Sequence, residues 1–106
     1  MSSPDHAALR PYGWAALSNE ETALLGNRLS ANIRAARLTA GLTQDLLGAH
    51  CHIGPDWILT LEDQQTPSLP RLVSLFAISR ATNVSLQDLL KDALPEGVYL
   101  CRAALR

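Results

Sequence analysis

The sequence predicts an all-α fold of five helices. Leu and Ala dominate the 106 residues, while aromatic side chains contribute only 5%, and this composition favours helices over sheets. Apolar residues recur at helical spacing, and serine or threonine repeatedly stands just before such a segment, where its hydroxyl can cap the helix. With 47% hydrophobic residues, the chain can build the core of a single domain.

The chain divides into an arm, a helical domain and an extension. The arm covers residues 1–17 and is interrupted by proline and glycine, with one short helical turn expected around His6–Arg10. Its aromatic residues Tyr12 and Trp14 are predicted to pin the arm to the core. A partner interface is the alternative, because tyrosine and tryptophan are enriched in interfaces. The helical domain covers residues 18–94.

The first helix is predicted to begin after Ser18. Ser18 and Glu21 have the spacing of a capping box, in which each side chain accepts a hydrogen bond from the other residue's backbone N–H. Gly41 is expected just past the helix end, in the left-handed conformation. The apolar stripe of this helix consists of Leu25, Leu29, Ile33 and Ala36.

Two short helices joined by a turn follow. Thr43 is predicted to cap a helix from Gln44 to Cys51, in which Gly48 lets a neighbouring helix approach closely. Residues 52–54 form the turn. A third helix, Pro55–Asp63, begins with a proline at the position where the missing N–H costs nothing. This arrangement is the outline of a helix-turn-helix.

Two further helices complete the predicted domain. Ser68 is expected to cap the fourth, with Pro70 in its first turn and Asn83 as a left-handed C-cap. Ser85 and Asp88 begin a short fifth helix. The expected inward-facing positions are Leu72, Leu75, Phe76 and Ser79 on the fourth helix and Leu86, Leu89 and Leu90 on the fifth.

The C-terminal extension, residues 95–106, has a different pattern. Residues 95–97 are typical of a turn, residues 98–101 have a strand-like composition, and residues 103–105 look helical. The extension either crosses to a second subunit or folds back on its own chain, and the pattern is compatible with both.

The segment Arg37-x-x-x-Gly-Leu-Thr-Gln, with Glu62 placed 18 residues after Gln44, is a fairly specific pattern. Through it, residues Leu29 to Leu90 resemble the Cro/lambda-repressor (XRE) family of helix-turn-helix proteins. The resemblance implies a lambda-repressor-like DNA-binding domain. The matching residues are Ile33, Arg37, Gly41, Leu42, Thr43, Gln44, Leu47, Gly48, Ile53, Ile58, Leu61, Glu62, Pro67, Ser68, Val84 and Leu89.

The resemblance also implies roles for individual residues. Arg37 and Glu62 would form a largely buried structural ion pair that ties the first helix to the third. The third helix would lie in the major groove of duplex DNA. The residues that the resemblance places at the DNA are Gln44, Pro55, Asp56, Trp57, Leu59, Thr60, Gln64, Gln65 and Arg71.

The composition of the third helix opposes DNA binding. The chain has a net charge of −1, and Pro55–Asp63 contains no Lys or Arg, although phosphate neutralisation supplies most non-specific affinity. Two functions therefore remain. One is a repressor-like transcriptional regulator that binds duplex DNA as a homodimer. The other is a helix-turn-helix-derived protein-interaction module with weak or no DNA binding, whose partner binds at Trp57 and Leu59 or at the C-terminal extension.

Other functions find little support in the sequence. No pattern places a nucleophile beside a base, so we expect neither an enzyme nor a cofactor. His50, Cys51 and His52, with Cys101 as a fourth ligand, lack the paired spacing of a structural zinc site, so no metal is expected. With no signal peptide and no membrane-spanning run, the expectation is a cytoplasmic protein whose cysteines stay reduced.

Overall fold

The computed structural model describes residues 12–66 and 68–99, and this part of the chain is all-α, which confirms the predicted fold class. It contains five helices and no strand: α2 (Asn19–Thr39), α3 (Gln44–Cys51), α4 (Pro55–Glu62), α5 (Leu72–Thr82) and α6 (Leu86–Leu89). The expectations for His6–Arg10, Cys101 and residues 103–105 lie outside the described residues.

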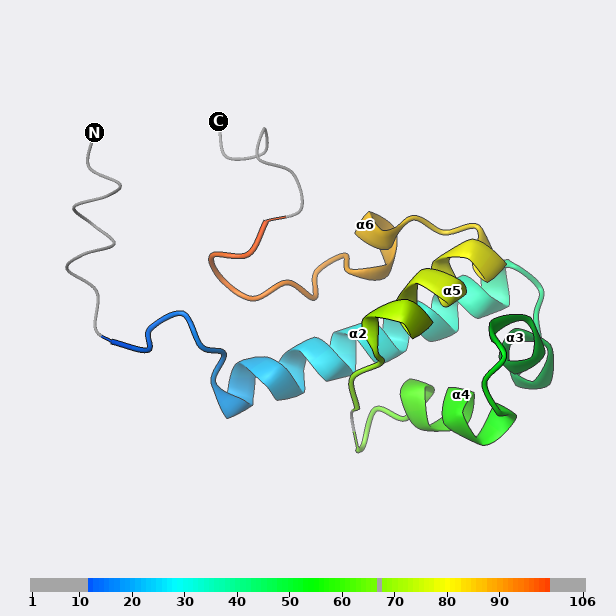
Figure 1. The fold of residues 1–106 in the computed structure, drawn as a ribbon, viewed down its shortest axis with the longest axis horizontal. Coiled ribbons are helices and arrows are strands. Elements are labelled where there is room, and N and C mark those ends of the chain that lie inside the picture. Colours follow the sequence, from blue (N-terminus) through cyan, green and yellow to red (C-terminus); the bar gives the residue numbers. More distant parts are fainter. Residues whose placement is uncertain (1–11, 67, 100–106) are drawn as a thin grey trace.

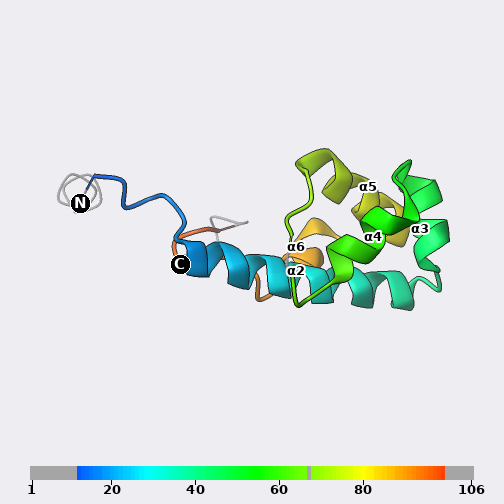
Figure 2. The same cartoon turned by 90° about the horizontal axis from the view of Figure 1, so that it is seen from below.

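Helix α2 is the longest element, and the other helices gather against its C-terminal half (Figures 1 and 2). The predicted capping box is present, because the Ser18 hydroxyl accepts from the Glu21 N–H and the Glu21 carboxylate accepts from the Ser18 N–H, both at 3.0 Å. Gly41 follows the helix with φ +74°, which confirms the predicted left-handed stop. The chain then turns sharply into α3.

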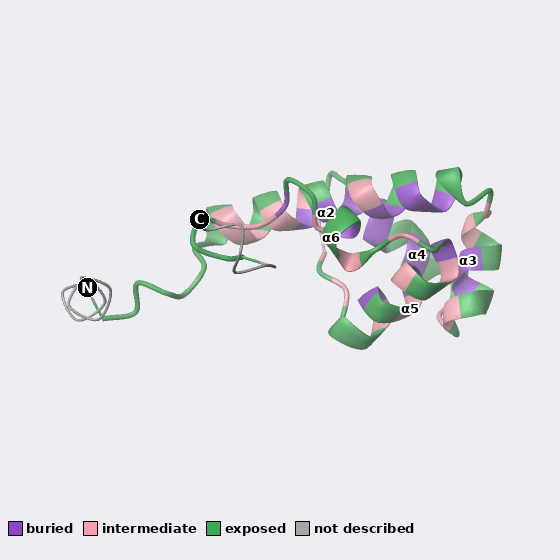
Figure 3. Ribbon diagram, turned by 90° about the horizontal axis from the view of Figure 1, so that it is seen from above, coloured by how far each residue is buried: buried purple, intermediate pink, exposed green. Residues whose placement is uncertain are grey.

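The core lies where α2, α4, α5 and α6 meet. Figure 3 shows buried positions on the facing sides of these helices. Burial of such aliphatic side chains is the main force that holds short helices together, because a helix of four to eleven residues is marginal alone. The buried cluster consists of Leu29, Ile33, Ala36, Leu61, Leu75, Ile78 and Leu89.

Helices α3 and α4 are joined by a tight turn that explains Gly48. A Cβ atom at this position would lie 2.6 Å from the Ile53 carbonyl oxygen and 3.3 Å from the Pro55 nitrogen. The expected close neighbour is therefore the backbone of the turn and of the first α4 residue. His52 ends α3 with φ +56°, in the left-handed region that glycine adopts most easily.

The predicted start of the fourth helix is wrong. Helix α5 begins at Leu72, and Arg71 is its N-cap with the extended angles φ −69° and ψ 154°. Pro70 supplies a reason, because a proline disfavours helical geometry in the residue before it, here Leu69. Ser68 is thus too far from the helix to cap it. Asn83 at the other end has φ +58°, as predicted.

The predicted buried stripe of this helix is also partly wrong. Leu72 and Phe76 are exposed, whereas Leu75, Ile78 and Thr82 are buried. Helices α2, α3 and α6 contact α5, and their combined position selects a face about one residue away from the predicted one. The apolar side chains that were assigned to the core consequently form an outer surface.

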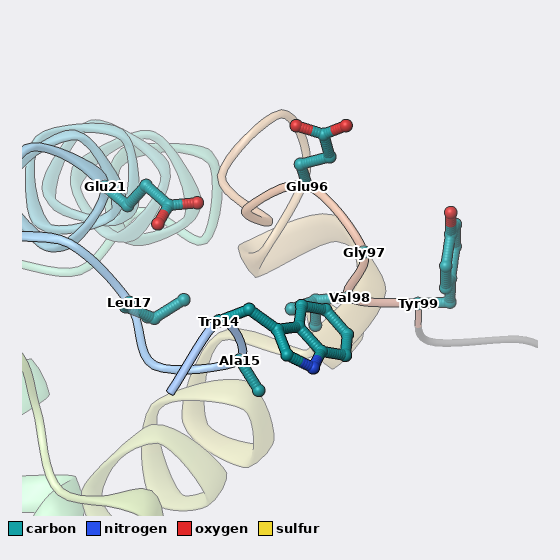
Figure 4. A pocket seen from close by; sticks show the side chains of 8 residues that line it. All are labelled: Trp14, Ala15, Leu17, Glu21, Glu96, Gly97, Val98 and Tyr99. Carbon is teal, nitrogen blue, oxygen red and sulfur yellow. The ribbon is translucent and has the colours of Figure 1, made fainter. Parts of the chain in front are cut away.

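The arm and the extension of this chain come together beside the N-terminal part of α2. Trp14, Ala15 and Leu17 line a hollow of about 480 Å³ together with Glu96, Gly97 and Val98. Figure 4 shows how these side chains are arranged around it. Tyr12 is fully exposed, so the prediction that it pins the arm to the core is wrong. Val98 and Tyr99 belong to no strand.

The end of α6 and the residues after it, just before the extension, are held to α2 by side-chain hydrogen bonds. The Arg28 guanidinium donates to the Asp92 carbonyl, and the Asn32 amide donates at 2.8 Å to the carbonyls of Leu89 and Lys91. These bonds occupy backbone oxygens that α6 leaves free at its C-terminal end. The chain is therefore held against α2 up to Asp92, three residues before the extension begins.

Replacing Gly48 by alanine should destabilise the protein by about 1–3 kcal/mol, because the new methyl group overlaps the turn backbone and outweighs the better helix propensity of alanine. Chemical denaturation measures this change. Gly54→Ala is the matched control, since no atom lies within 4 Å of its Cβ position. Equal effects of the two substitutions would contradict the close approach.

Replacing His52 by glycine should stabilise the protein by about 0.5–1 kcal/mol, because glycine removes the left-handed strain and loses only part of that gain to its entropy in the unfolded chain. Asn83→Gly is the comparison, since asparagine tolerates the same conformation better at φ +58°. Thermal unfolding should show the larger increase for His52→Gly. A decrease at His52 would refute the strain assignment.

Candidate nucleic-acid interface

Arg37 and Glu62 form a buried ion pair between α2 and α4. The Arg37 Nε atom donates to Glu62 Oε2 at 2.7 Å, and Nη2 donates to Oε1 at 3.0 Å, so the contact is bidentate. Both residues are 8% exposed. The hydrogen bonds to Glu62 raise the pKa of Arg37 further, against the opposing effect of burial.

Two neighbours complete the hydrogen bonding of this pair. Arg37 Nη1 donates to the Leu42 carbonyl at 2.9 Å, and the Gln44 amide donates to Glu62 Oε1 at 3.2 Å. The pair thus connects the end of α2, the start of α3 and the end of α4. Gln44, which the resemblance places at a phosphate, has its amide group directed toward Glu62.

The solvent face of α4 carries most of the predicted base-contacting residues. Pro55, Asp56, Leu59 and Thr60 are exposed, while Ile58 and Leu61 are buried on the opposite side. The Thr60 hydroxyl donates to the Asp56 carbonyl at 2.9 Å, which occupies its donor. This face therefore offers one carboxylate, one apolar side chain and a hydroxyl oxygen.

Trp57 lies on a different side of α4 from Leu59. Residues two positions apart on a helix are separated by about 200°, so Trp57 and Leu59 occupy opposite flanks. Trp57 faces α5 and lines an open hollow of about 760 Å³ together with Val73 and Ala77. The structure does not bring Trp57 and Leu59 into one apolar patch.

The loop after α4 is ordered by Asp63. Its carboxylate accepts hydrogen bonds from the Gln65 N–H at 2.9 Å and from the Thr66 hydroxyl at 2.7 Å. The bond from Thr66 is the main reason that the pKa of Asp63 is lowered. The side chains of Gln64 and Gln65 are exposed on this loop. Among the described residues, no hydrogen bond joins either side chain to the solvent face of α4.

Exposed positive charge lies on the elements beside α4. Arg71, the exposed N-cap residue of α5, lines the same hollow as Gly54 and Trp57. Arg34 on α2 and Arg80 on α5 are also exposed. Residues 64–87 contain Arg71 and Arg80 but no Asp or Glu, so this segment has a net positive charge. The resemblance places Arg71 at the DNA, but the sequence did not predict that Arg71 lines a hollow with Gly54 and Trp57.

Within the described ranges, no three His, Cys, Asp or Glu side chains gather closely enough to hold a metal ion. Cys51 is half-buried, and this burial raises the pKa of its thiol. None of the described helices is long and apolar enough to cross a membrane.

Removing one partner of the ion pair should cost about 3–5 kcal/mol, because the other charge remains buried without its counter-charge. Arg37→Met tests this by chemical denaturation, and Arg34→Met on the exposed side of α2 is the control. The double variant Arg37→Met, Glu62→Leu should be more stable than Arg37→Met alone. Near wild-type stability of Arg37→Met would exclude a structural role for the pair.

Comparison with known proteins does not assign the chain to a family. No family model matches it, and neither a curated protein nor a solved structure matches it. A function must therefore be argued from its own residues and their geometry.

Proposed function

We propose that this protein is a repressor-like transcriptional regulator that binds duplex DNA as a homodimer. The observation that carries the proposal is the α3–turn–α4 unit, whose second helix is fixed to α2 by the Arg37–Glu62 pair while its opposite side stays exposed. A helix held in this way fits the major groove, where its first residues contact base edges. In this arrangement Asp56 accepts from a cytosine amino group and Leu59 contacts a thymine methyl group.

Phosphate contacts in the proposed complex come from outside α4. Arg71 is exposed at the start of α5 and lines the hollow that Gly54 also lines, and Arg34 is exposed on α2. A dimer doubles these charges, which matters because neutralised phosphates supply most of the affinity for any duplex. Backbone contacts of this kind would set the position of α4 while its own weak contacts read the bases.

The second candidate, a protein-interaction module, is favoured by the acidity of the same region. From residue 29 to 63 there are two positive and four negative residues. One of the positive residues, Arg37, is already paired with Glu62. Asp56 on the outer side of α4 would be repelled by phosphates. If this repulsion dominates, the fold persists but the exposed side of α4 contacts a protein.

The separating experiment is a salt series of binding to random duplex DNA and to the duplex upstream of the gene, measured by fluorescence anisotropy. A DNA-binding protein should lose affinity linearly on a log–log plot, with a slope of about −0.9 for each phosphate neutralised. Arg71→Gln should reduce the steepness of that slope by about one contact. Absence of binding at low salt, for a protein that is dimeric in the same buffer, would contradict the proposal.

Substitutions on α4 separate groove contact from phosphate contact. Asp56→Asn should tighten binding to random DNA by roughly threefold to tenfold, because it removes one negative charge near the phosphates. Leu59→Ala should instead weaken binding mainly to the upstream duplex. Leu38→Ala, which removes an equally exposed leucine from α2, is the control. If Asp56→Asn tightens binding but Leu59→Ala has no effect, α4 contributes only non-specific electrostatic attraction to DNA and does not contact bases.

A further inference from the structure

The outer side of α5 carries an exposed apolar stripe, which consists of Leu72, Val73 and Phe76. These positions lie within about 100° of one another around the helix, so their side chains share one side of it. Leu72 is 64% exposed, Val73 is 61% exposed and Phe76 is 47% exposed. Apolar side chains that gather on a surface usually mark an interaction site, whereas scattered ones do not.

The α5 stripe continues into the hollow between α4 and α5. Val73 belongs to both features, and Trp57 and Ala77 line the hollow with it. Because the hollow is open to solvent, it does not enclose a small ligand on most sides, as a small-molecule pocket does. A row of apolar side chains beside an open apolar hollow is instead the kind of surface that receives the apolar side of an amphipathic helix.

The polar side chains around the hollow favour an anionic group. Arg71 and His52 line it, and none of the described residues that line it is Asp or Glu. The Arg71 guanidinium has no ion-pair partner in the described part of the chain, and the imidazole of His52 supplies a further N–H donor. Helix α5 has no side-chain cap, so the positive end of its dipole, at Arg71, adds to this charge. The hollow therefore complements a carboxylate as well as an apolar side chain.

Other occupants match only part of this surface. A second copy that presented the same surface would bring only positive charge to it, because residues 64–87 contain Arg71 and Arg80 but no acidic residue. The phosphates of duplex DNA match Arg71 but leave the apolar stripe without a contact. A partner that carries both carboxylates and large apolar side chains matches the charge and the stripe together.

We propose that the α5 stripe and the adjoining hollow bind an acidic amphipathic helix of a partner protein. One apolar side chain of that helix enters the hollow beside Trp57, others cover Leu72 and Phe76, and a carboxylate pairs with Arg71. The surface is distinct from the outer side of α4, since Leu59 does not line the hollow. The pairing takes Arg71 away from the phosphate that it neutralises in the proposed DNA complex, so the partner releases the protein from DNA. This release rests on the proposed function, whereas the contact itself does not.

Peptides selected from a displayed random library on the full chain test the contact. Selection should enrich peptides that combine Asp or Glu with large apolar residues at helical spacing. Binding of a synthetic copy of a selected peptide is then measured by fluorescence anisotropy without DNA. Arg71→Gln should weaken this binding roughly tenfold, because a hydrogen-bonded charge pair is lost. Arg34→Gln on the exposed side of α2 is the control and should leave peptide binding unchanged.

Variants of the stripe and a reversal of charge sharpen the test. Phe76→Ala should weaken peptide binding at least about fivefold, because it removes an apolar anchor. Leu46→Ala on α3 is the matched control, since Leu46 is 48% exposed and Phe76 47%. A peptide with lysine in place of its acidic residues should bind Arg71→Glu more tightly than it binds the wild type. Circular dichroism establishes that each variant is folded.

The fluorescence of Trp57 gives an independent readout. Trp57 is the sole tryptophan of a Trp14→Phe variant, and the bound peptide should shield it from quenching by iodide. Selection that enriches no peptide, or only peptides without Asp and Glu, overturns the proposal, as does equal weakening by Arg71→Gln and Arg34→Gln. Shielding of Trp57 by single-stranded oligothymidine but by no peptide also overturns it, and assigns the surface to single-stranded nucleic acid.

Competition with random duplex DNA tests the release. The selected peptide should displace the duplex from the wild type, and simultaneous binding of peptide and duplex overturns the release. Peptide binding by a protein without DNA affinity contradicts the DNA proposal and leaves the contact standing. DNA binding by a protein that selects no acidic peptide does the reverse.

Discussion

The buried Arg37–Glu62 pair is the constraint that orients α4. Aliphatic contacts among Ile33, Leu61 and Ile78 hold the helices together, but such contacts are not directional and tolerate rotation. A bidentate guanidinium–carboxylate contact is planar and fixes the rotation of both helices. Its desolvation cost is offset only because the Leu42 carbonyl and the Gln44 amide satisfy further hydrogen bonds. The exposed side of α4 is therefore set by a polar interaction inside the domain.

The sequence located those features that depend on local chemistry. The hydroxyl groups of Ser18, Thr43 and Ser85 each accept a hydrogen bond from the backbone N–H three residues later. A short hydroxyl side chain just before a helix reaches this free N–H directly. Gly41 and Asn83 take the left-handed conformation for the same local reason. The pairing of Arg37 with Glu62 was expected from the family resemblance rather than from local chemistry, and the two side chains do meet.

Features that depend on the relative placement of several helices could not be predicted from the sequence. The buried side of α5 is decided jointly by three neighbouring helices, so periodicity within α5 could not distinguish Leu75 and Ile78 from Leu72 and Phe76. The position of Trp57 at the hollow beside α5 has the same origin. The helical angle between Trp57 and Leu59, by contrast, already indicates that the two residues do not form one patch. The sequence predicts a close neighbour for Gly48, and the structure shows that this neighbour is the turn backbone.

Helix α4 has eight residues and presents three sides, and each side has a different neighbour. Its inner side packs against the core, its Trp57 flank borders the hollow at α5, and its outer side remains in solvent. The inner side has no room for positive charge, since a long basic side chain there would lose its solvation. On the outer side, where such a residue would stay solvated, Asp56 stands instead. The basic residues of the proposed DNA contact therefore lie on neighbouring elements, so the affinity for DNA and the reading of bases would be properties of different helices.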